Sequence, residues 1–434
     1  MELIVKKKFN IFKVLILTFL VVSVLFFIIS SIYDWKIAEI FAKGFSNKIS
    51  KIWIIFMDEL GMYIFEPSVF VMFAIWWETF VLYQKKYAKN EFFNKNVWVS
   101  YIFYIVCFVL SALFIYFQTI QRFADYDSGF GSSFDPKLLE SISWRHWSYA
   151  IVRVIQVSLM LFGAYYCRYI FSKRKDVFTQ EYWIDAFKGM LYMMTLALMI
   201  LAVKWSFGRP FYYNNIFSSI LEEIEARGYT YNPNIIKWGA GVGARGDVPY
   251  FEWWEPNGFF ENMKYWFASD SAGNLSDNAW WNRAFPSGHT TSNFAAFGLW
   301  FCFLGEHKGR KLTNKKIAVL VFCFLLLNSM KFSLMVYRFH WLSDLEFSTI
   351  FSILMIPAVN SLVDKHMTYF INLFKTRALK QTIPGVVIET KNGFYLCMYK
   401  EFGYQKISYY ISPKKSAPEK ISKKMKKFSL TQDE

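Results

Sequence analysis

The chain has 434 residues, of which 55% are hydrophobic and 21% are aromatic, and its formal net charge is +16. This composition excludes an ordinary soluble domain of that length. A strongly basic charge is common in nucleic-acid-binding proteins, but here the Lys and Arg residues gather in connections between long apolar runs, which indicates orientation in a membrane and attraction to anionic lipid. We therefore expect membrane lipids as partners and no nucleic acid.

Taken in chain order, the apolar runs predict about eight transmembrane helices. Residues 12–32 hold one charge near their start and are long enough to cross a bilayer. The run at 60–83 is weaker because Glu66, Pro67 and Glu78 interrupt it. The other runs lie at 97–117, 149–170, 185–203, 290–304, 317–336 and 345–363. The predicted fold class is therefore an all-α polytopic membrane protein.

These runs divide the chain into three parts. Residues 1–95 hold two spans that look peripheral and accessory, residues 96–364 hold a core of six spans, and residues 365–434 form a basic tail. Lys and Arg are concentrated in alternate connections, which predicts that both termini are cytoplasmic. The long Trp-rich connection at 211–283 then lies outside, and its length suggests a functional or separately folded insert. We expect a multi-pass protein of the plasma membrane.

Three short segments carry the residues with catalytic potential. They are "KWSFGRP" at 204–210, "FPSGH" at 285–289 and "RFHWLSD" at 338–344. Each lies at the predicted outer end of a span. The three segments should therefore meet at the outer membrane face, although they are far apart in the sequence.

The "FPSGH" segment has the features of a helix start that binds an anion. Pro286 can open a helix, Ser287 can cap it, and Gly288 lets the backbone approach a ligand closely. The exposed N–H groups and the helix dipole attract negative charge at such a position. His289, in the first turn, can then give a proton to a leaving group.

The "RFHWLSD" segment pairs a histidine with a carboxylate. His340 and Asp344 are four residues apart, so they are neighbours on a helix. A carboxylate on one ring nitrogen fixes the tautomer and leaves the other nitrogen free to attack. Lys204, Arg209 and Arg338 add three cations. Together these groups predict phosphoryl transfer through a histidine intermediate.

The three segments resemble the motifs of the type-2 phosphatidic acid phosphatase superfamily, which also contains bacterial acid phosphatases and vanadium haloperoxidases. The family pattern is Lys-x6-Arg-Pro, then Pro-Ser-Gly-His, then Ser-Arg-x5-His-x3-Asp. The resemblance implies a six-helix core and catalysis without a metal or other cofactor. It implies that His340 is the nucleophile, that Asp344 orients it, and that His289 is the general acid and then the base for water. The residues implied to bind the phosphate are Lys204, Arg209, Ser287 and the Gly288 amide.

The sequence departs from this pattern at two positions. Arg209 follows Lys204 with four intervening residues instead of six, although Gly208 and Pro210 predict that the helix ends near Phe207. Leu334 stands where the family has an arginine, and we predict that Arg338 supplies the missing cation. The alternative is that both arginines are interfacial cations that extend towards water. Lys331, on the same predicted helix, is open to the same two interpretations.

The sequence therefore predicts an integral-membrane phosphatase whose site faces the outside. Its substrate would be a lipid phosphate monoester or a prenyl diphosphate, because amphipathic substrates reside at the lipid–water boundary. One alternative is a phosphotransferase, in which a hydroxyl instead of water captures the same phosphohistidine. The other alternative is a catalytically degenerate protein that binds or transports lipid.

Overall fold

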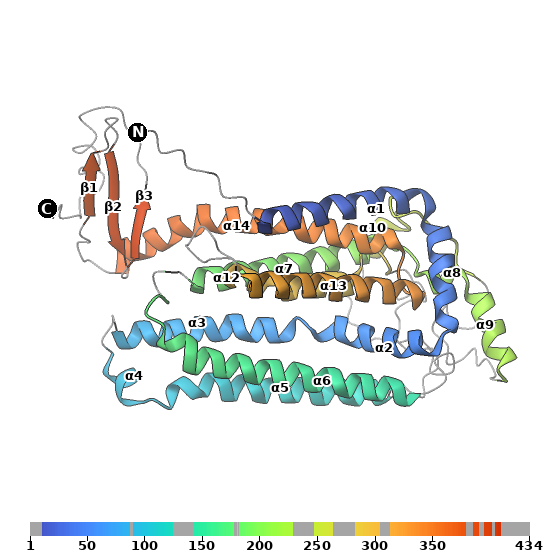
Figure 1. Cartoon of the computed structure of the whole chain (residues 1–434), viewed down its shortest axis with the longest axis horizontal. Coiled ribbons are helices and arrows are strands. Elements are labelled where there is room, and N and C mark those ends of the chain that lie inside the picture. Colours follow the sequence, from blue (N-terminus) through green and yellow to red (C-terminus); the bar gives the residue numbers. More distant parts are fainter. Residues whose placement is uncertain are drawn as a thin grey trace.

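The computed structural model describes residues 11–86, 90–124, 142–177, 180, 182–228, 247–263, 283–303, 313–378, 385–389, 395–401 and 404–408. Long helices lie side by side along one direction and make up most of this part of the chain (Figure 1). The fold class predicted from the apolar runs, an all-α polytopic membrane protein, is confirmed.

The N-terminal half begins with the most apolar of the long helices and contains most of the predicted peripheral region. Its helices are α1 (Ile11–Ala42), the 3₁₀ turn η1 (Lys43–Ser46), α2 (Lys48–Tyr63), α3 (Glu66–Lys86), α4 (Glu91–Lys95), α5 (Val99–Ala124) and α6 (Ile142–Tyr165), which continues as the π-helical turn η2 (Tyr166–Ile170) and the 3₁₀ turn η3 (Phe171–Lys173).

The C-terminal half contains all three motif segments. Its helices are α7 (Tyr182–Phe207), α8 (Tyr212–Asn215), α9 (Phe217–Ala226), α10 (Phe259–Met263), α11 (Gly288–Ala296), the 3₁₀ turn η6 (Phe297–Leu299), α12 (Trp300–Phe303), α13 (Asn314–Val336) and α14 (Leu342–Ala378). In the tail, strands β1 (Gly385–Glu389), β2 (Tyr395–Glu401) and β3 (Tyr404–Ser408) form an antiparallel sheet in that order.

Seven helical stretches among the described residues are long and apolar enough to cross a membrane, one fewer than the sequence predicts. The difference lies at 290–304, where α11, η6 and α12 replace one continuous span. The turn η6 interrupts the helix, and neither piece reaches the length that a span requires. The chain still passes along α7 here, because both α11 and α12 contact that helix. In Figure 1, α12 lies at the end of the bundle opposite α8.

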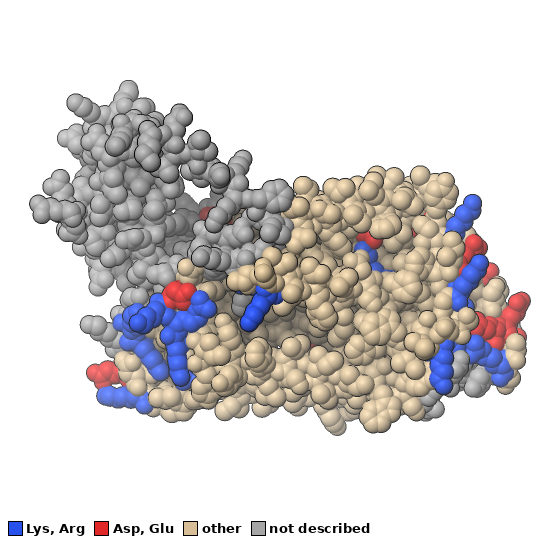
Figure 2. All heavy atoms as spheres, in the orientation of Figure 1, with Lys and Arg blue, Asp and Glu red and all other residues tan. Residues whose placement is uncertain are grey.

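The surface of the bundle has the polarity of a membrane protein. Large apolar side chains are exposed along α1, α5 and α6, including Leu25, Leu110 and Phe162. Figure 2 shows Lys and Arg gathered towards the two ends of the molecule, with mostly uncharged side chains between them. This distribution matches an apolar belt in lipid and charged ends in water.

Helices α7 and η6 approach each other through two glycines. A Cβ atom on Gly189 would lie 2.6 Å from the carbonyl oxygen of Gly298 and would also clash with the Met72 Sδ atom. Small residues allow such close backbone contact between helices in a membrane.

We expect Gly189→Ala to lower the free energy of unfolding by about 1–3 kcal/mol, because overpacking forces backbone or side-chain shifts. Thermal unfolding of the purified protein in detergent would measure the loss. The matched control is Leu198→Ala on the same helix, since Leu198 is 61% exposed and should change stability little. Equal midpoints for wild type and Gly189→Ala would contradict the close contact.

The first two helices are not peripheral to the bundle, contrary to the appearance of the sequence. Helix α1 packs along α14, and α2 packs against α6, α11 and α13. Both helices bring buried carboxylates to the end of the bundle where the motif segments lie, namely Asp34 and Asp58. Two buried carboxylates next to the motif segments therefore come from outside the predicted six-helix core.

Candidate active site

The three motif segments meet at one end of the bundle, as predicted. Helix α7 ends at Phe207, where the sequence expects it to end, and Gly208 follows with a φ of 66°. Ser287 caps α11, with its hydroxyl oxygen accepting from the Thr290 N–H. The third segment lies between α13 and α14, and the backbone of Ser287 donates to the carbonyl of Asp344 over 3.3 Å.

His340 and Asp344 form the predicted histidine–carboxylate pair. The Nδ1 atom of His340 lies 3.3 Å from Oδ2 of Asp344, and the Trp341 backbone N–H donates to the same oxygen over 3.2 Å. His340 is 2% exposed and Asp344 is fully buried. Because Nδ1 carries the hydrogen bond to the carboxylate, Nε2 is the nitrogen left for a ligand.

Burial lowers the pKa of His340 to about 4. The hydrogen bond with Asp344 opposes this shift, whereas the charge of Lys204 adds to it. The folded chain thus keeps His340 neutral between about pH 4 and pH 6.5, the ordinary pKa of histidine. In this pH range the unfolded chain would bind a proton at His340. This group therefore lowers stability as the pH falls through that window, but it keeps an unprotonated imidazole available.

We expect the rate of phosphoenzyme formation at pH 5.5 to stay close to its value at pH 7, because His340 is still neutral there. Rapid quenching in alkaline detergent, in which phosphohistidine is stable, after mixing with labelled substrate would measure the rate. An imidazole with the ordinary pKa of 6.5 would have about tenfold less of its neutral form at pH 5.5 than at pH 7. A tenfold slower rate would therefore contradict the lowered pKa of His340.

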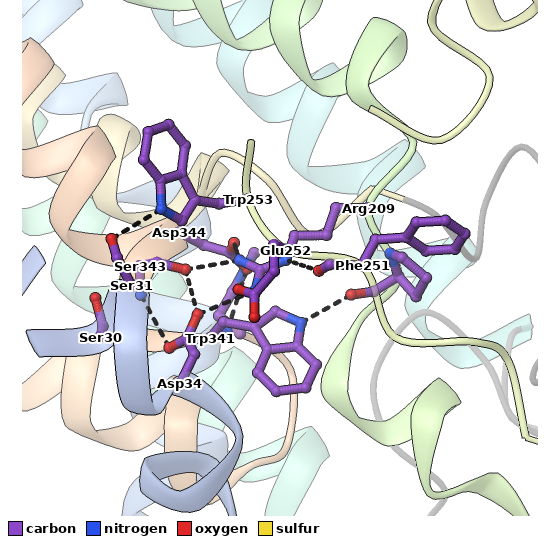
Figure 3. A network of polar contacts seen from close by, with 12 residues as sticks. Ser30, Ser31, Asp34, Arg209, Phe251, Glu252, Trp253, Trp341, Ser343 and Asp344 are labelled. Carbon is purple, nitrogen blue, oxygen red and sulfur yellow. Dashed lines mark hydrogen bonds and ion pairs between the residues drawn. The ribbon is translucent and has the colours of Figure 1, made fainter. Parts of the chain in front are cut away.

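Arg209 is fully engaged with protein oxygens (Figure 3). Its Nη1 atom donates to Asp344 Oδ1 and to the Ser343 hydroxyl, both over 2.6 Å. Its Nη2 atom donates to Asp34 Oδ2 over 3.0 Å and to the Tyr250 hydroxyl over 3.3 Å, and its Nε atom donates to the Phe251 carbonyl. A guanidinium has five N–H donors. Arg209 therefore has no N–H group left to bind a phosphate, as was predicted for it, and it positions Asp344 instead.

Asp34 is a site residue that the sequence reasoning missed. It comes from α1, is 3% exposed, and accepts from Arg209 and from both the backbone N–H and the hydroxyl of Ser343. Asp34 and Asp344 lie on neighbouring helices, α1 and α14, and Figure 3 shows the Arg209 guanidinium close to both. In the sequence, Asp34 stands just after the first apolar run, and no motif includes it.

Lys204 and Gly288, two of the residues expected to bind phosphate, lie close together. The Lys204 ammonium is 3.8 Å from the position that a Cβ atom on Gly288 would occupy. Ser287 uses its hydroxyl oxygen as the helix cap and also accepts from the Thr290 hydroxyl over 3.1 Å. An ammonium beside a helix N-terminus is suited to an anion.

His289 faces the site from the first turn of α11. Its ring centroid lies 6.4 Å from that of His340, with the two ring planes 72° apart. The two predicted catalytic histidines, which are 51 positions apart in the sequence, are thus neighbours in the fold. Two imidazoles at this separation can act on opposite sides of a small tetrahedral group.

Arg338 and Lys331 form ion pairs that the sequence did not predict. The Arg338 guanidinium pairs with Glu223 of α9 over 3.2 Å and lies over the Phe45 ring. Arg338 was predicted to replace the missing family arginine. In the structure its guanidinium contacts Glu223 and Phe45 instead. Lys331 pairs with Glu346 over 2.5 Å between α13 and α14, which favours the structural interpretation of this lysine.

Arg283 is a second site cation that the motif analysis did not single out. It is 7% exposed and its charge acts directly on Lys204. Arg283 lies three residues before Pro286, and the backbone N–H of the next residue, Ala284, donates to the Arg209 carbonyl over 2.9 Å. Its position in the sequence, two residues before the start of the "FPSGH" segment, was the signal.

Comparison with known proteins agrees with the motif segments. The family model of the PAP2 superfamily matches residues 186–368. An uncharacterized protein of Mycoplasma capricolum subsp. capricolum is 30% identical to the chain over 389 residues, which are 85% of this chain and 95% of that protein. No solved structure matches the chain. The matched region contains every predicted site residue, whereas Asp34 and Asp58 lie outside it.

Proposed function

Because the chain belongs to the PAP2 superfamily, which includes phosphatases and other phosphoesterases, we propose that it removes phosphate from a membrane lipid. The substrate class is a lipid phosphate monoester or a prenyl diphosphate. The observation that carries the proposal is the His340–Asp344 pair with the ring of His289 6.4 Å from that of His340. This arrangement supplies a nucleophile, a group that orients it, and a proton donor.

In the first step, Nε2 of His340 attacks phosphorus and the bond from phosphorus to the leaving oxygen breaks. His289 gives its proton to that oxygen, and the alcohol or the shorter phosphate leaves. Asp344 holds the proton on Nδ1 of His340 and stabilises the cationic ring. In the second step, water loses a proton to His289 and attacks phosphorus, so that His340 is regenerated and phosphate is released.

The charge around the phosphate would come from Lys204, Arg283 and the N–H groups at the start of α11. Lys204 lies against Gly288, and Arg283 is buried close to Lys204. Two cations and a helix N-terminus stabilise the extra negative charge that develops in the transition state. In this proposal Arg209 does not contact the phosphate, because all its N–H groups donate to protein oxygens. It acts by positioning Asp344.

A lipid is the favoured substrate because the site sits at the end of an apolar bundle. The seven described spanning stretches place the His340 segment directly between two of them, α13 and α14. An amphipathic molecule in the bilayer would present its phosphate at that level. We propose a plasma-membrane location with the site on the outer face, which the distribution of Lys and Arg in the sequence favours.

A phosphate-release panel would test the proposal. The purified protein would be given phosphatidate, phosphatidylglycerol phosphate, prenyl diphosphates and phosphorylated glycolipids, with the His340→Ala protein as background. We expect release from at least one of these substrates by the wild type only. No release from any of them would contradict the phosphatase proposal.

Two other functions share the site. A phosphotransferase would pass the phosphoryl group from His340 to a lipid or sugar hydroxyl, so added acceptors would yield a phosphorylated product in place of free phosphate. A non-catalytic lipid-binding protein is favoured by Leu334 at the family arginine position. Vanadate imitates the transition state of phosphoryl transfer, so failure of vanadate to bind would favour this last function.

A further inference from the structure

Helix α2 contacts His289 through a buried carboxylate. Oδ1 of Asp58 lies 3.1 Å from Nε2 of His289, and Asp58 is 4% exposed. Both atoms are buried and neither makes a hydrogen bond among the described residues, so their 3.1 Å contact is an ion pair that is not aligned as a hydrogen bond. A buried carboxylate is costly unless an opposite charge or a donor accompanies it, and the His289 ring is the group in place to do so.

The same helix also leaves space for the His289 ring. Gly61 lies three residues, about one turn, after Asp58, so the two residues share one face of α2. A Cβ atom on Gly61 would lie 3.0 Å from Cδ2 of His289 and 3.4 Å from Cγ of Met330. Asp58 and Gly61 therefore both lie against the Nε2–Cδ2 edge of one imidazole.

The two histidines of the site have carboxylates on different ring nitrogens. Asp344 lies at Nδ1 of His340, whereas Asp58 lies at Nε2 of His289. A carboxylate holds the proton on the nitrogen that it faces, so it fixes the tautomer of the neutral ring. His340 is then left with Nε2 for attack, and His289 is left with Nδ1.

We propose that α2 is the element that positions His289, with Asp58 holding the proton on Nε2 so that Nδ1 exchanges protons with the substrate and with water. The inference rests on the proposed phosphatase function. In the first step the Nδ1 proton of the His289 imidazolium passes to the leaving oxygen as its bond to phosphorus breaks. In the second step Nδ1 accepts a proton from the attacking water, and the Nε2 proton stays between the ring and Asp58 throughout.

The dependence of the rate on the leaving group tests this role. 4-Nitrophenol leaves without help, whereas an alkyl alcohol requires protonation, so we compare 4-nitrophenyl phosphate with octyl phosphate. We expect Asp58→Asn to slow the alkyl ester about 10²-fold or more and the aryl ester only a few-fold. Asp58→Asn should add little to the loss already caused by His289→Ala, because both changes impair one proton donor.

Two further variants separate positioning from general damage. Gly61→Ala pushes on the His289 ring without changing any charge, and we expect the same selective loss with the alkyl ester. Asp176→Asn makes the same chemical change as Asp58→Asn in an exposed ion pair with Arg174 beyond the other end of α6. We expect the control to change neither rate. Equal losses with both esters in the Asp58 and Gly61 variants would overturn the proposal and leave the phosphatase function intact.

A spectroscopic measurement needs no activity. The chain has five histidines, so ring ¹⁵N signals can be assigned with single His→Gln variants. In the neutral wild-type ring we expect the proton on Nε2 for His289 and on Nδ1 for His340, and we expect Asp58→Asn to remove that preference at His289 alone. A wild-type His289 with its proton on Nδ1 would overturn the inference, even if no substrate were turned over. No phosphate release from any ester or lipid would instead overturn the proposed function.

Discussion

Replacing His340 with alanine is expected to lower phosphate release by about 10⁴-fold or more, because it removes the atom that forms the covalent intermediate. The buried pair with Asp344, with Nδ1 and Oδ2 3.3 Å apart, presents Nε2 as the nucleophile. Acid-labile, base-stable labelling of the protein by a ³²P substrate would detect phosphohistidine. We expect this label in the wild type and none in His340→Ala.

The control for His340 is a histidine elsewhere in the fold. His146 lies in α6 and stacks on Phe123, with ring centroids 4.1 Å apart. We expect His146→Ala to keep both the label and the rate. Labelling that persists in His340→Ala would assign the nucleophile to another residue.

Replacing Arg209 with alanine is expected to lower the free energy of unfolding by about 3–5 kcal/mol, because it leaves buried carboxylates without their cation. Asp34 and Asp344 are both almost fully buried, and Arg209 lies between them at 3.0 and 2.6 Å. Phosphate release should fall as well, since Asp344 loses the contact that holds its second oxygen. Unfolding in denaturant and phosphate release would be measured on the same preparation.

The double variant Arg209→Ala, Asp34→Asn distinguishes a positioning role from phosphate binding. Removing one buried negative charge should restore part of the stability lost in Arg209→Ala, because the two sites interact directly. If Arg209 bound phosphate instead, Arg209→Ala would weaken vanadate binding and leave the unfolding transition in place. That second pattern would contradict the network in Figure 3.

Several local features of the candidate site could be predicted from the sequence, because their signals lie in neighbouring residues. Pro286, Ser287 and Gly288 describe a helix start by their own backbone and side-chain chemistry, and the structure caps α11 with Ser287. His340 and Asp344 are four residues apart, and this spacing brings them together within one turn of chain. Gly208 and Pro210 likewise predicted the end of α7 at Phe207.

The partners of these residues could not be predicted in the same way. Asp34 lies 175 positions from Arg209, and Asp58 lies 231 positions from His289. No periodicity or motif links such positions, because the contacts depend on which helices pack together. The ion pair of Arg338 could not be predicted for the same reason, since its partner Glu223 lies on another helix. The span at 290–304 was overestimated because hydropathy does not detect the 3₁₀ turn at η6.

The sequence alone determined that this is a multi-helix membrane protein with a histidine pair, because hydrophobic length and short motifs are properties of neighbouring residues. Only the tertiary structure decided how each charged group is used. Burial at the end of the bundle requires every charge to find a partner, and α1 and α2 provide carboxylates for Arg209 and His289. Through these contacts the two helices that looked peripheral in the sequence become part of the site.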